Sequence, residues 1–257
     1  LIGLVGSEMC IRDSRLTADE LREKITDKTK LLVLPYPNNP TGAIMRREDL
    51  EAIAKVLKDT NIMIASDEIY SELTYSGKHC SIAEIEGMRE RTIVINGFSK
   101  SFAMTGWRLG FLGGPKEIVS QMLKLHQYAI MSSPTVSQYA AIVAMHSCQK
   151  DIDAMRNEYN IRRRFVVDSF NKLGLKCFAP QGAFYVFPCI KSTGMTSTDF
   201  CEKLVYTKKV AVVPGDAFGE CGEGYVRVSY AYSLNHLREA IKRIGEFLED
   251  IKNGNVQ

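Results

Sequence analysis

Residues 92–110 read TIVINGFSKSFAMTGWRLG, an apolar run that turns polar at Ser99 and then becomes rich in glycine. The run predicts a β-strand over 92–98. Two similar apolar runs precede it in the chain, KLLVLP at 30–35 and NIMIASD at 61–67. Continuous apolar runs of this length are typical of strands that are buried on both faces of a parallel sheet. The three runs therefore predict the centre of a mainly parallel β-sheet.

Helical patterns separate and follow these strands. Residues 46–59 carry one apolar helical stripe, formed by Leu50, Ile53, Ala54 and Leu57. Further helices are predicted from the capping-box sequence at 17–20, over 115–128, from Ser133 and Pro134, over 151–173 and from Ser233 onwards. Further strands are predicted over 108–112, 183–190, 210–214 and 226–232.

The rhythm of the pattern changes after Gly174, from strand–helix alternation to short strands with helices between them. This change predicts an α/β fold with a mainly parallel sheet over 15–150 and a smaller α+β domain over 151–257. The long helix over 151–173 is expected to bridge the two domains.

The first fourteen residues, LIGLVGSEMCIRDS, differ from everything that follows. They contain no initiator Met at their start and lack the basic region of a signal peptide. We predict that residues 1–14 are a non-native leader, such as translated sequencing-adapter sequence, and the fold is therefore read from Arg15 onwards.

Composition excludes several classes of function. The chain of 257 residues is 45% hydrophobic and 25% charged, with a formal net charge of +3, the ordinary balance of a globular protein. The one basic run, Arg162 to Arg164, lies in a helical pattern, so no nucleic-acid partner is expected. No stretch approaches the roughly 20 apolar residues that span a membrane. The seven scattered cysteines form no C-x-x-C pair, which favours a cytoplasmic protein without a disulfide framework or metal site.

Polar residues follow each of the three apolar strands at its carboxyl end. Asn39 follows the first strand, Asp67 ends the second with Tyr70 beyond it, and Lys100 follows the third. Ligands of open α/β sheets bind beyond the carboxyl ends of the strands. If the strands are parallel, these four side chains converge on one edge of the sheet.

The chemistry of this set suits a pyridine-based cofactor. A carboxylate keeps a pyridine nitrogen protonated, an amide and a phenol can hydrogen-bond a ring oxygen, and a lysine can form an imine and later move a proton. An arginine suits bidentate recognition of phosphate or carboxylate. Arg108 follows Lys100 by eight positions, and Arg227 lies in a predicted strand of the second domain.

Five segments together resemble the ordered signatures of class I aminotransferases, which are fold type I pyridoxal-phosphate enzymes. The segments are PNNPTG (37–42), SDEIYSEL (66–73), GFSKSFAMTGWRLG (97–110), GAFYVFP (182–188) and VRVSYAYS (226–233). Taken singly, each could be a turn, a cap or core packing. Their common order from Arg15 to the C-terminus favours the family, and the lysine segment is the most specific of them.

The resemblance implies a cofactor-binding role for most of these residues. Lys100 forms the covalent link to pyridoxal 5'-phosphate, Asp67 pairs with the pyridine nitrogen, and Asn39 and Tyr70 contact the ring oxygen. Arg108 binds the phosphate.

Three further expectations concern the rest of the pocket. Ser99 is a weaker candidate for the phosphate, and Gly97 stands where many relatives have a phosphate-binding Ser. Arg227 binds the substrate α-carboxylate, beside Asn39. GAFYVFP is expected to pack near the site without taking part in the chemistry, and the four histidines are expected to be structural or surface residues.

The implied function is that of a transaminase, which moves an amino group from an amino acid to a 2-oxo acid by a ping-pong mechanism. Segment 126–141 resembles that of enzymes that act on aromatic or acidic amino acids, so a substrate of one of these classes is expected. Two alternatives stay open: a lyase or synthase of the same fold, and a non-catalytic fragment or effector-binding module. Relatives are homodimers, so a homodimer is expected. In relatives the segment that precedes Arg15 carries the aromatic residue stacked on the cofactor and further phosphate contacts, and these are not found here.

Overall fold

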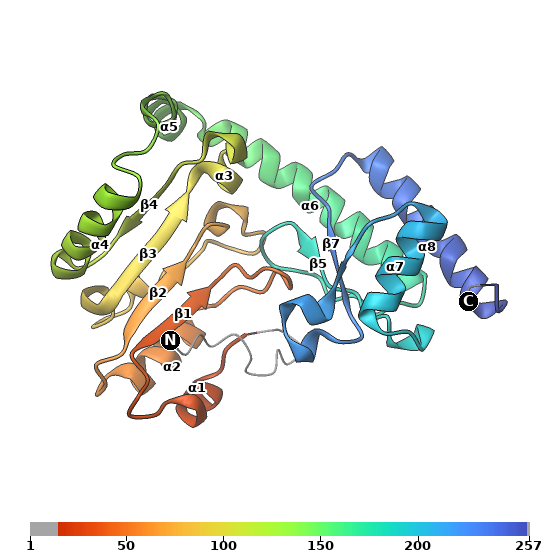
Figure 1. Cartoon of the computed structure of the whole chain (residues 1–257), viewed down its shortest axis with the longest axis horizontal. Helices are drawn as coiled ribbons and strands as arrows, with labels where there is room; N and C mark the ends of the chain where they lie inside the picture. The colour runs from red at the N-terminus through yellow and green to blue at the C-terminus, as the bar shows by residue number, and fades with distance from the viewer. Residues whose placement is uncertain (1–14, 256–257) are drawn as a thin grey trace.

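The computed structural model describes residues 15–255, so the predicted leader at 1–14 lies outside the described residues. Its larger sheet has four strands in the order β1-β2-β3-β4. They are Leu31–Pro35 (β1), Met63–Asp67 (β2), Thr92–Gly97 (β3) and Gly110–Gly113 (β4). Strands β1, β2 and β3 run parallel, and β4 runs antiparallel to β3 (Figure 1). The predicted mainly parallel sheet is therefore confirmed.

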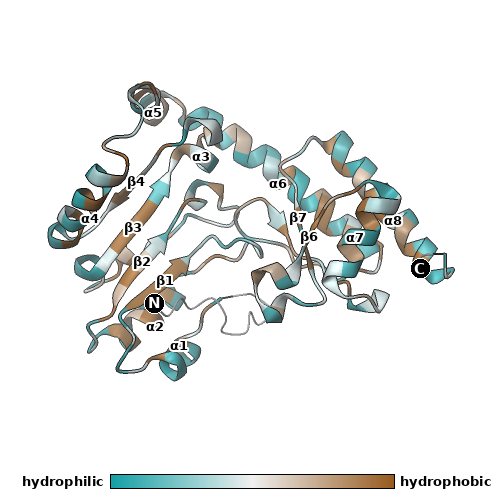
Figure 2. Cartoon of the chain, in the orientation of Figure 1, coloured by the Kyte–Doolittle hydropathy of each residue, from teal (hydrophilic) through white to brown (hydrophobic). Residues whose placement is uncertain are grey.

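Two helices, α1 (Ala18–Lys24) and α2 (Arg47–Leu57), pack on β1 and β2. The capping box predicted for α1 forms, because Thr17 and Glu20 bond each other's backbone. The predicted stripe of α2 is buried against the sheet, where each fully buried Leu or Ile stabilises the fold by about 1.5–3 kcal/mol. Figure 2 shows the matching hydrophobic character of β1 and β3.

The strand predicted over 108–112 begins two residues later, at Gly110, and Arg108 lies outside it. Arg108 has a left-handed backbone (φ 52°, ψ 47°) and ends the 3-10 turn Thr105–Trp107. Gly110 lets β4 approach β3 closely, since a Cβ there would lie 3.1 Å from the Asn96 carbonyl oxygen. Gly110, which is in register with Gly97, thus sets where β4 starts to pair with β3.

Helices α3 (Phe98–Ser101), α4 (Lys116–Ala129) and α5 (Thr135–Ser147) follow β3 and β4. Pro115 and Pro134 stand immediately before α4 and α5, one position earlier than the first-turn place predicted for Pro115. Large apolar side chains are exposed around α4 and α5, including Tyr128 (93% exposed) and Met131 (80%). An exposed apolar surface of this extent is typical of an interaction site.

The long helix α6 (Gln149–Lys172) runs from beside α5 to the second sheet (Figure 1). It begins two residues before the predicted start at Asp151. Its last turns bury Val166, Val167 and Phe170 in the second hydrophobic core. The predicted division of domains at 150 and 151, with this helix as the bridge, stays a prediction.

The second sheet is antiparallel and has the order β5-β7-β6. Its strands are Tyr185–Val186 (β5), Val213–Pro214 (β6) and Val226–Ser229 (β7). Helices α7 (Ser197–Lys208) and α8 (Leu234–Lys252) pack beside it, and Ser233 caps α8 as predicted. The strands are shorter than predicted because part of the pairing is reduced to isolated bridges, such as Cys189 with Tyr225.

Short 3-10 turns complete the described chain. They are Ser71–Leu73 (η1), Ile82–Glu84 (η2), Arg89–Arg91 (η3), Thr105–Trp107 (η4), Lys191–Thr193 (η5), Gly215–Phe218 (η6) and Glu220–Gly222 (η7). Within residues 15–255, no helix has the length and apolar character that crossing a membrane requires.

The turn after β1 is fastened to the chain that enters β5. The carbonyl of Gly42 accepts hydrogen bonds from the backbone N–H groups of Gln181 and Gly182, both over 2.8 Å. Gly42 has φ +70°, and a Cβ there would lie 2.3 Å from Cβ of Pro180. Only glycine fits this crossing without a shift, so the two sheets are held together at this turn.

Candidate functional site

The carboxyl ends of β1, β2 and β3 meet at one edge of the larger sheet. Pro35 at the end of β1 is in register with Asp67 at the end of β2, and Asp67 is in register with Ile95 of β3. The parallel pairing from which the sequence placed Asn39, Tyr70 and Lys100 at one edge is therefore confirmed.

Lys100 lies in the single turn α3, directly after β3. Phe98 anchors this turn because its ring is buried with Met104 and two alanines of α5. Nζ of Lys100 lies 5.9 Å from the ring centroid of Tyr70 and 5.8 Å from that of Phe184. The amine of Lys100 therefore faces two aromatic rings, with no carboxylate within ion-pair distance among residues 15–255.

Gly97 comes just before this turn and is enclosed by backbone. A Cβ at Gly97 would lie 3.1 Å from both Cα of Gly110 and the carbonyl oxygen of Leu109, and 3.2 Å from Cδ1 of Ile69. A larger residue would require these neighbours to move by a few tenths of an ångström. The close approach of β4 gives a packing reason for glycine at this position.

Tyr70 is buried, and its hydroxyl lies 3.0 Å from the hydroxyl of Tyr185. Burial raises the pKa of Tyr70 above its ordinary value. The hydrogen bond shared with Tyr185 and the charge of Asp67 raise that pKa further, while Arg227 lowers it. Asp67 itself accepts the backbone N–H of Ile69 at Oδ1 over 3.1 Å. The phenol of Tyr70 is thus held in its protonated, hydrogen-bonding form.

Arg227 projects from β7 toward the turn that follows β1. Its Nη1 donates a hydrogen bond to Oδ1 of Asn39 over 2.9 Å. The guanidinium carbon lies 4.7 Å from the ring centroid of Tyr185 and 4.9 Å from that of Phe218. Within the described residues no carboxylate pairs with Arg227. Its position is fixed by aromatic rings and an amide, which leaves its charge available to an anion.

Ser99 and Arg108 are less closely connected to this group. The carbonyl of Ser99 accepts a hydrogen bond from the hydroxyl of Thr105 over 2.9 Å, and Nη1 of Arg108 donates to the carbonyl of Thr105 over 2.8 Å. Arg108 is exposed. Among residues 15–255 no hydrogen bond or ion pair joins either side chain to Lys100; Ser99 lies with Lys100 in α3, and Arg108 follows the turn Thr105–Trp107. A left-handed non-glycine residue such as Arg108 carries strain of about 1–3 kcal/mol, which is typical of functional loops.

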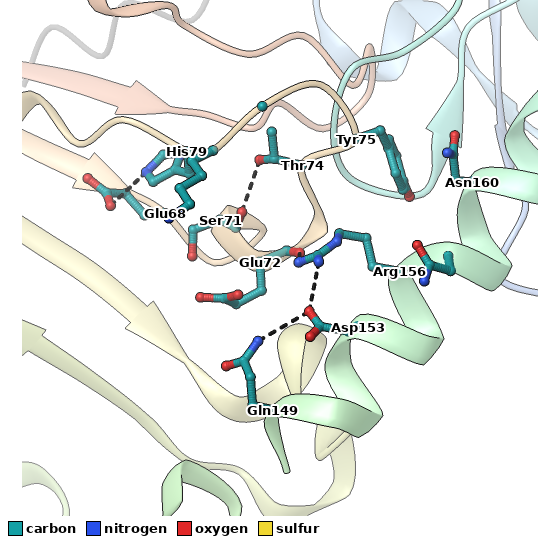
Figure 3. Close-up of a pocket in the computed structure, with 13 residues that line it drawn as sticks. Glu68, Ser71, Glu72, Thr74, Tyr75, His79, Gln149, Asp153, Arg156 and Asn160 are labelled. Carbon is teal, nitrogen blue, oxygen red and sulfur yellow. Dashed lines mark hydrogen bonds and ion pairs between the residues drawn. The ribbon is translucent and has the colours of Figure 1, made fainter.

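A polar pocket of about 670 Å³ lies between residues 68–79 and the first half of α6 (Figure 3). Four of its charged or titratable groups pair with one another. Glu68 is bonded by His79 over 2.8 Å, and Arg156 pairs with Asp153 over 2.7 Å. Lys100 does not line this pocket. The candidate site is therefore the open edge of the sheet, and this pocket is separate from it.

Comparisons with known proteins identify the family of the chain. The sequence profile of the family described as "Aminotransferase class I and II" matches residues 7–244. The chain belongs to the class I and II aminotransferases.

Individual members of the aminotransferase family resemble the chain over most of its length. It is 47% identical to an aspartate aminotransferase of Pyrococcus abyssi and 47% identical to aromatic-amino-acid aminotransferase 2 of Thermococcus litoralis, with 93% of this chain and 62% of each relative covered. The crystal structure of an aromatic aminotransferase from Pyrococcus horikoshii matches with a TM-score of 0.91 and 46% identity, covering 93% of this chain and 65% of that one. The fold is fold type I, and the chain spans less than two thirds of the length of these aminotransferases.

Class I and II aminotransferases use pyridoxal 5'-phosphate. The donor set at the sheet edge fits that group: an amine (Lys100), a carboxylate (Asp67), a phenol held protonated (Tyr70), an amide (Asn39) and arginines without acidic partners in the described chain. Each can meet a different part of a phosphorylated pyridine aldehyde or of its amino acid substrate.

The sequence did not identify Tyr185 as part of this aminotransferase site, because GAFYVFP was read as packing. In the structure Tyr185 contacts both Tyr70 and Arg227. One signal could have found it: a tyrosine in an otherwise apolar buried strand needs a hydrogen-bond partner for its hydroxyl. Phe184 and Phe218 are the other aromatic neighbours that the sequence left unassigned.

Proposed function

We propose that the protein is a pyridoxal-phosphate-dependent aminotransferase that moves an amino group from an amino acid to a 2-oxo acid by a ping-pong mechanism. One observation carries this proposal. The amine of Lys100 faces Tyr70 at the sheet edge, and Tyr185 joins Tyr70 to Arg227. A nucleophilic amine and an anion-binding guanidinium are thus organised around one phenol.

The residues that would hold the cofactor are those named from the sequence. When bound, pyridoxal 5'-phosphate supplies a protonated pyridine ring that takes up the electron pair released at the substrate α-carbon. Asp67 holds the proton on the pyridine nitrogen. Asn39 and Tyr70 donate hydrogen bonds to the ring oxygen. Arg108, with Ser99, binds the phosphate.

Two residues act on the substrate. Lys100 binds the cofactor covalently through Nζ, and as a free amine the same atom moves the proton of the substrate α-carbon. Arg227 binds the α-carboxylate, since its planar fork matches the two carboxylate oxygens. The rings of Tyr185 and Phe218 limit the directions in which that fork can turn. Lys100, Asp67 and Tyr70 are therefore the proposed catalytic residues.

We assign the substrate to the aromatic or acidic amino acids. The support is the names of relatives at 47% identity, an aspartate and an aromatic-amino-acid aminotransferase.

A homodimer in the cytoplasm is part of the same proposal. The exposed apolar side chains around α4 and α5 support a partner surface, and the free cysteines in the described chain suit a reducing compartment. Size-exclusion chromatography with light scattering tests the dimer, and a monomer at micromolar concentration would contradict it.

The reaction is tested with the cofactor-loaded protein and one amino acid alone. A transaminase converts its cofactor once, to the pyridoxamine form, and releases one equivalent of 2-oxo acid, after which it stops until an oxo acid is added. Continuous release of ammonia or a thiol would identify a lyase instead. A protein that develops no visible absorption band with pyridoxal 5'-phosphate would indicate a non-catalytic fragment or effector-binding module.

A further inference from the structure

Within the described residues Tyr185 contacts Tyr70 in one half of the proposed site and Arg227 in the other. Its hydroxyl lies 3.0 Å from the hydroxyl of Tyr70, at the end of the larger sheet, and its ring lies 4.7 Å from the guanidinium carbon of Arg227, in the smaller sheet. The proposed function gives the ring of Tyr185 a packing role against Arg227 and gives its hydroxyl no role toward the cofactor. Its two contacts are of different kinds, so they can be removed separately.

The backbone that carries Tyr185 is held rigidly. Ala183, two residues earlier, is fully buried and has φ +56°, a left-handed conformation that costs a non-glycine residue of order 1–3 kcal/mol. Its carbonyl accepts hydrogen bonds from the hydroxyls of Tyr75 and Tyr230, the latter over 3.1 Å. Gly182 fits tightly against Pro37, since a Cβ there would lie 2.6 Å from Cβ of that proline. These contacts maintain a strained segment whose effect is to fix where Tyr185 points.

The ring of Tyr185 is equally constrained. It lies edge-on to the ring of Tyr70, with 5.9 Å between centroids and 80° between planes, and 4.8 Å from the centroid of Phe184. Tyr185 pairs with Ser229 across the sheet, two residues after Arg227 on β7. The guanidinium of Arg227 thus lies within 5 Å of the ring centroids of both Tyr185 (4.7 Å) and Phe218 (4.9 Å). A ring in this place excludes water from one face of the guanidinium and leaves its edge for hydrogen bonds.

The hydroxyl pair has a direct chemical consequence for Tyr70. A phenol has one proton to donate, and a donor that reaches its oxygen leaves that proton available for another acceptor. If Tyr185 donates to Tyr70, the proton of Tyr70 can point to the cofactor ring oxygen, and the chain of two hydrogen bonds strengthens each of them. The alternative direction would direct the proton of Tyr70 away from the cofactor.

We propose that Tyr185 is a positioning residue that aims the phenol of Tyr70 at the cofactor ring oxygen through its hydroxyl and holds Arg227 for the substrate carboxylate through its ring. The inference rests on the proposed aminotransferase function and extends it to a side chain that touches neither cofactor nor substrate in that scheme. The hydroxyl and the ring have separable effects. Removing the hydroxyl alters the environment of the cofactor, and removing the ring also weakens binding of the carboxylate.

Three variants of the cofactor-loaded protein separate these effects. Tyr185→Phe keeps the ring and removes the hydroxyl, Tyr185→Leu removes both, and Tyr159→Phe is the matched control, because it removes the hydroxyl of a half-buried tyrosine elsewhere in the same aromatic cluster. Two readouts that do not depend on turnover are measured. One is the pKa of the visible absorption band of the bound cofactor, and the other is the Kd of a non-reacting 2-methyl amino acid.

Tyr185→Phe is expected to raise the pKa of the band by about half a unit or more, the size of one net hydrogen bond, and to leave the Kd within about twofold of the unmodified protein. Tyr185→Leu is expected to raise the band pKa similarly and to raise the Kd by about 3- to 30-fold, the range of one cation–π contact. Tyr159→Phe should change neither quantity. Near-ultraviolet circular dichroism establishes that each variant is folded.

Two outcomes overturn the inference. One is a band pKa in Tyr185→Phe that equals that of Tyr159→Phe, and the other is a Tyr185→Leu protein whose Kd is unchanged. An unmodified protein that forms no visible band with pyridoxal 5'-phosphate overturns the proposed function, and with it this role. A failure of the function is thus seen in the unmodified protein, whereas a failure of the inference is seen in the variants alone.

Discussion

Arg227 donates a hydrogen bond from Nη1 to Oδ1 of Asn39 over 2.9 Å, although the two residues are 188 positions apart. Asn39 lies in the turn after β1 of the larger sheet and Arg227 in β7 of the smaller sheet. The bond therefore joins the residue proposed to bind the substrate carboxylate to one proposed to contact the cofactor ring oxygen. A substrate carboxylate that binds Arg227 must either share Nη1 of Arg227 with Oδ1 of Asn39 or displace that hydrogen bond.

Arg227→Lys tests the carboxylate role. Lysine keeps the charge and loses both the planar fork and the stacking between Tyr185 and Phe218. Since a hydrogen bond to a charged group contributes about 1.5–3 kcal/mol, KM for the amino acid should rise about 10- to 100-fold. Arg156→Lys is the matched control, because Arg156 pairs with Asp153 in the separate polar pocket. Equal KM values in the two variants, measured by steady-state kinetics, would refute the assignment of Arg227.

Much of the larger sheet could be predicted because its signals are local. The apolar runs and the stripe of α2 depend only on spacing along the chain, and both agree with the structure. The placement of Lys100 after β3 follows from the same runs. The antiparallel direction of β4 could not be read, because a four-residue strand bounded by Gly110 and Gly113 carries no signal of orientation.

The contacts between the two sheets could not be predicted from the sequence. Asn39 and Arg227 were both named, but their hydrogen bond depends on how β7 is placed against the turn after β1. The role of Tyr185 was missed for the same reason, since both of its site contacts are with other elements. The expected phosphate role of Ser99 and Arg108 stays a prediction, and in the structure both residues are connected to Thr105.

Lys100→Ala tests the covalent and proton-moving role of Lys100. The variant should lose the absorption band that depends on a bond to Nζ, and kcat should fall at least about 1,000-fold, because the general base is lost with the nucleophile. Lys176→Ala is the matched control, since Nζ of Lys176 also lies over an aromatic ring, 5.2 Å from the centroid of Phe178. Spectroscopy and single-turnover kinetics measure the two effects. A Lys100→Ala protein that keeps its band would disprove the covalent role.

Gly42→Ala tests the junction that holds Asn39 near Arg227. Gly42 has φ +70°, and a Cβ there would meet Cβ of Pro180 at 2.3 Å and the carbonyl oxygen of Gly182 at 2.7 Å. A left-handed alanine costs about 1–2 kcal/mol, and overpacking adds about 1–3 kcal/mol. The free energy of unfolding in urea should therefore fall by about 2–5 kcal/mol.

Gly77→Ala separates the two causes of that loss. Gly77 has nearly the same backbone, φ +78°, but nothing lies within 4 Å of its added Cβ. It should lose only the conformational part, about 1–2 kcal/mol. If both alanine variants were equally stable, steric contact at the junction would not explain why Gly42 is required.

The free energy of unfolding should fall as the pH is lowered into the acid range, and this acid limb of the stability profile should be due to Glu68. Burial alone would raise the pKa of this carboxyl, but hydrogen bonds from His79, Ser81 and Ser66, with the charge of His79, together lower it. A carboxylate whose pKa is lower in the folded state stabilises the fold at every pH above its unfolded value. That stabilisation is lost as the pH falls from the ordinary glutamate value toward the lowered one.

Glu68→Gln should therefore flatten the acid limb when the urea midpoint is measured between neutral pH and the acid transition. At neutral pH the variant should be less stable, because His79 loses its charged partner over 2.8 Å and the NH2 group that replaces one carboxylate oxygen cannot accept a hydrogen bond. Glu239→Gln is the control, since the pKa of Glu239 is also lowered, by Arg243, but its carboxyl is fully exposed and screened by solvent. The Glu239 variant should keep the acid limb of the unmodified protein. If the acid limb of the Glu68→Gln protein were as steep as that of the unmodified protein, protonation of Glu68 would not cause it. Other carboxyls would then be responsible.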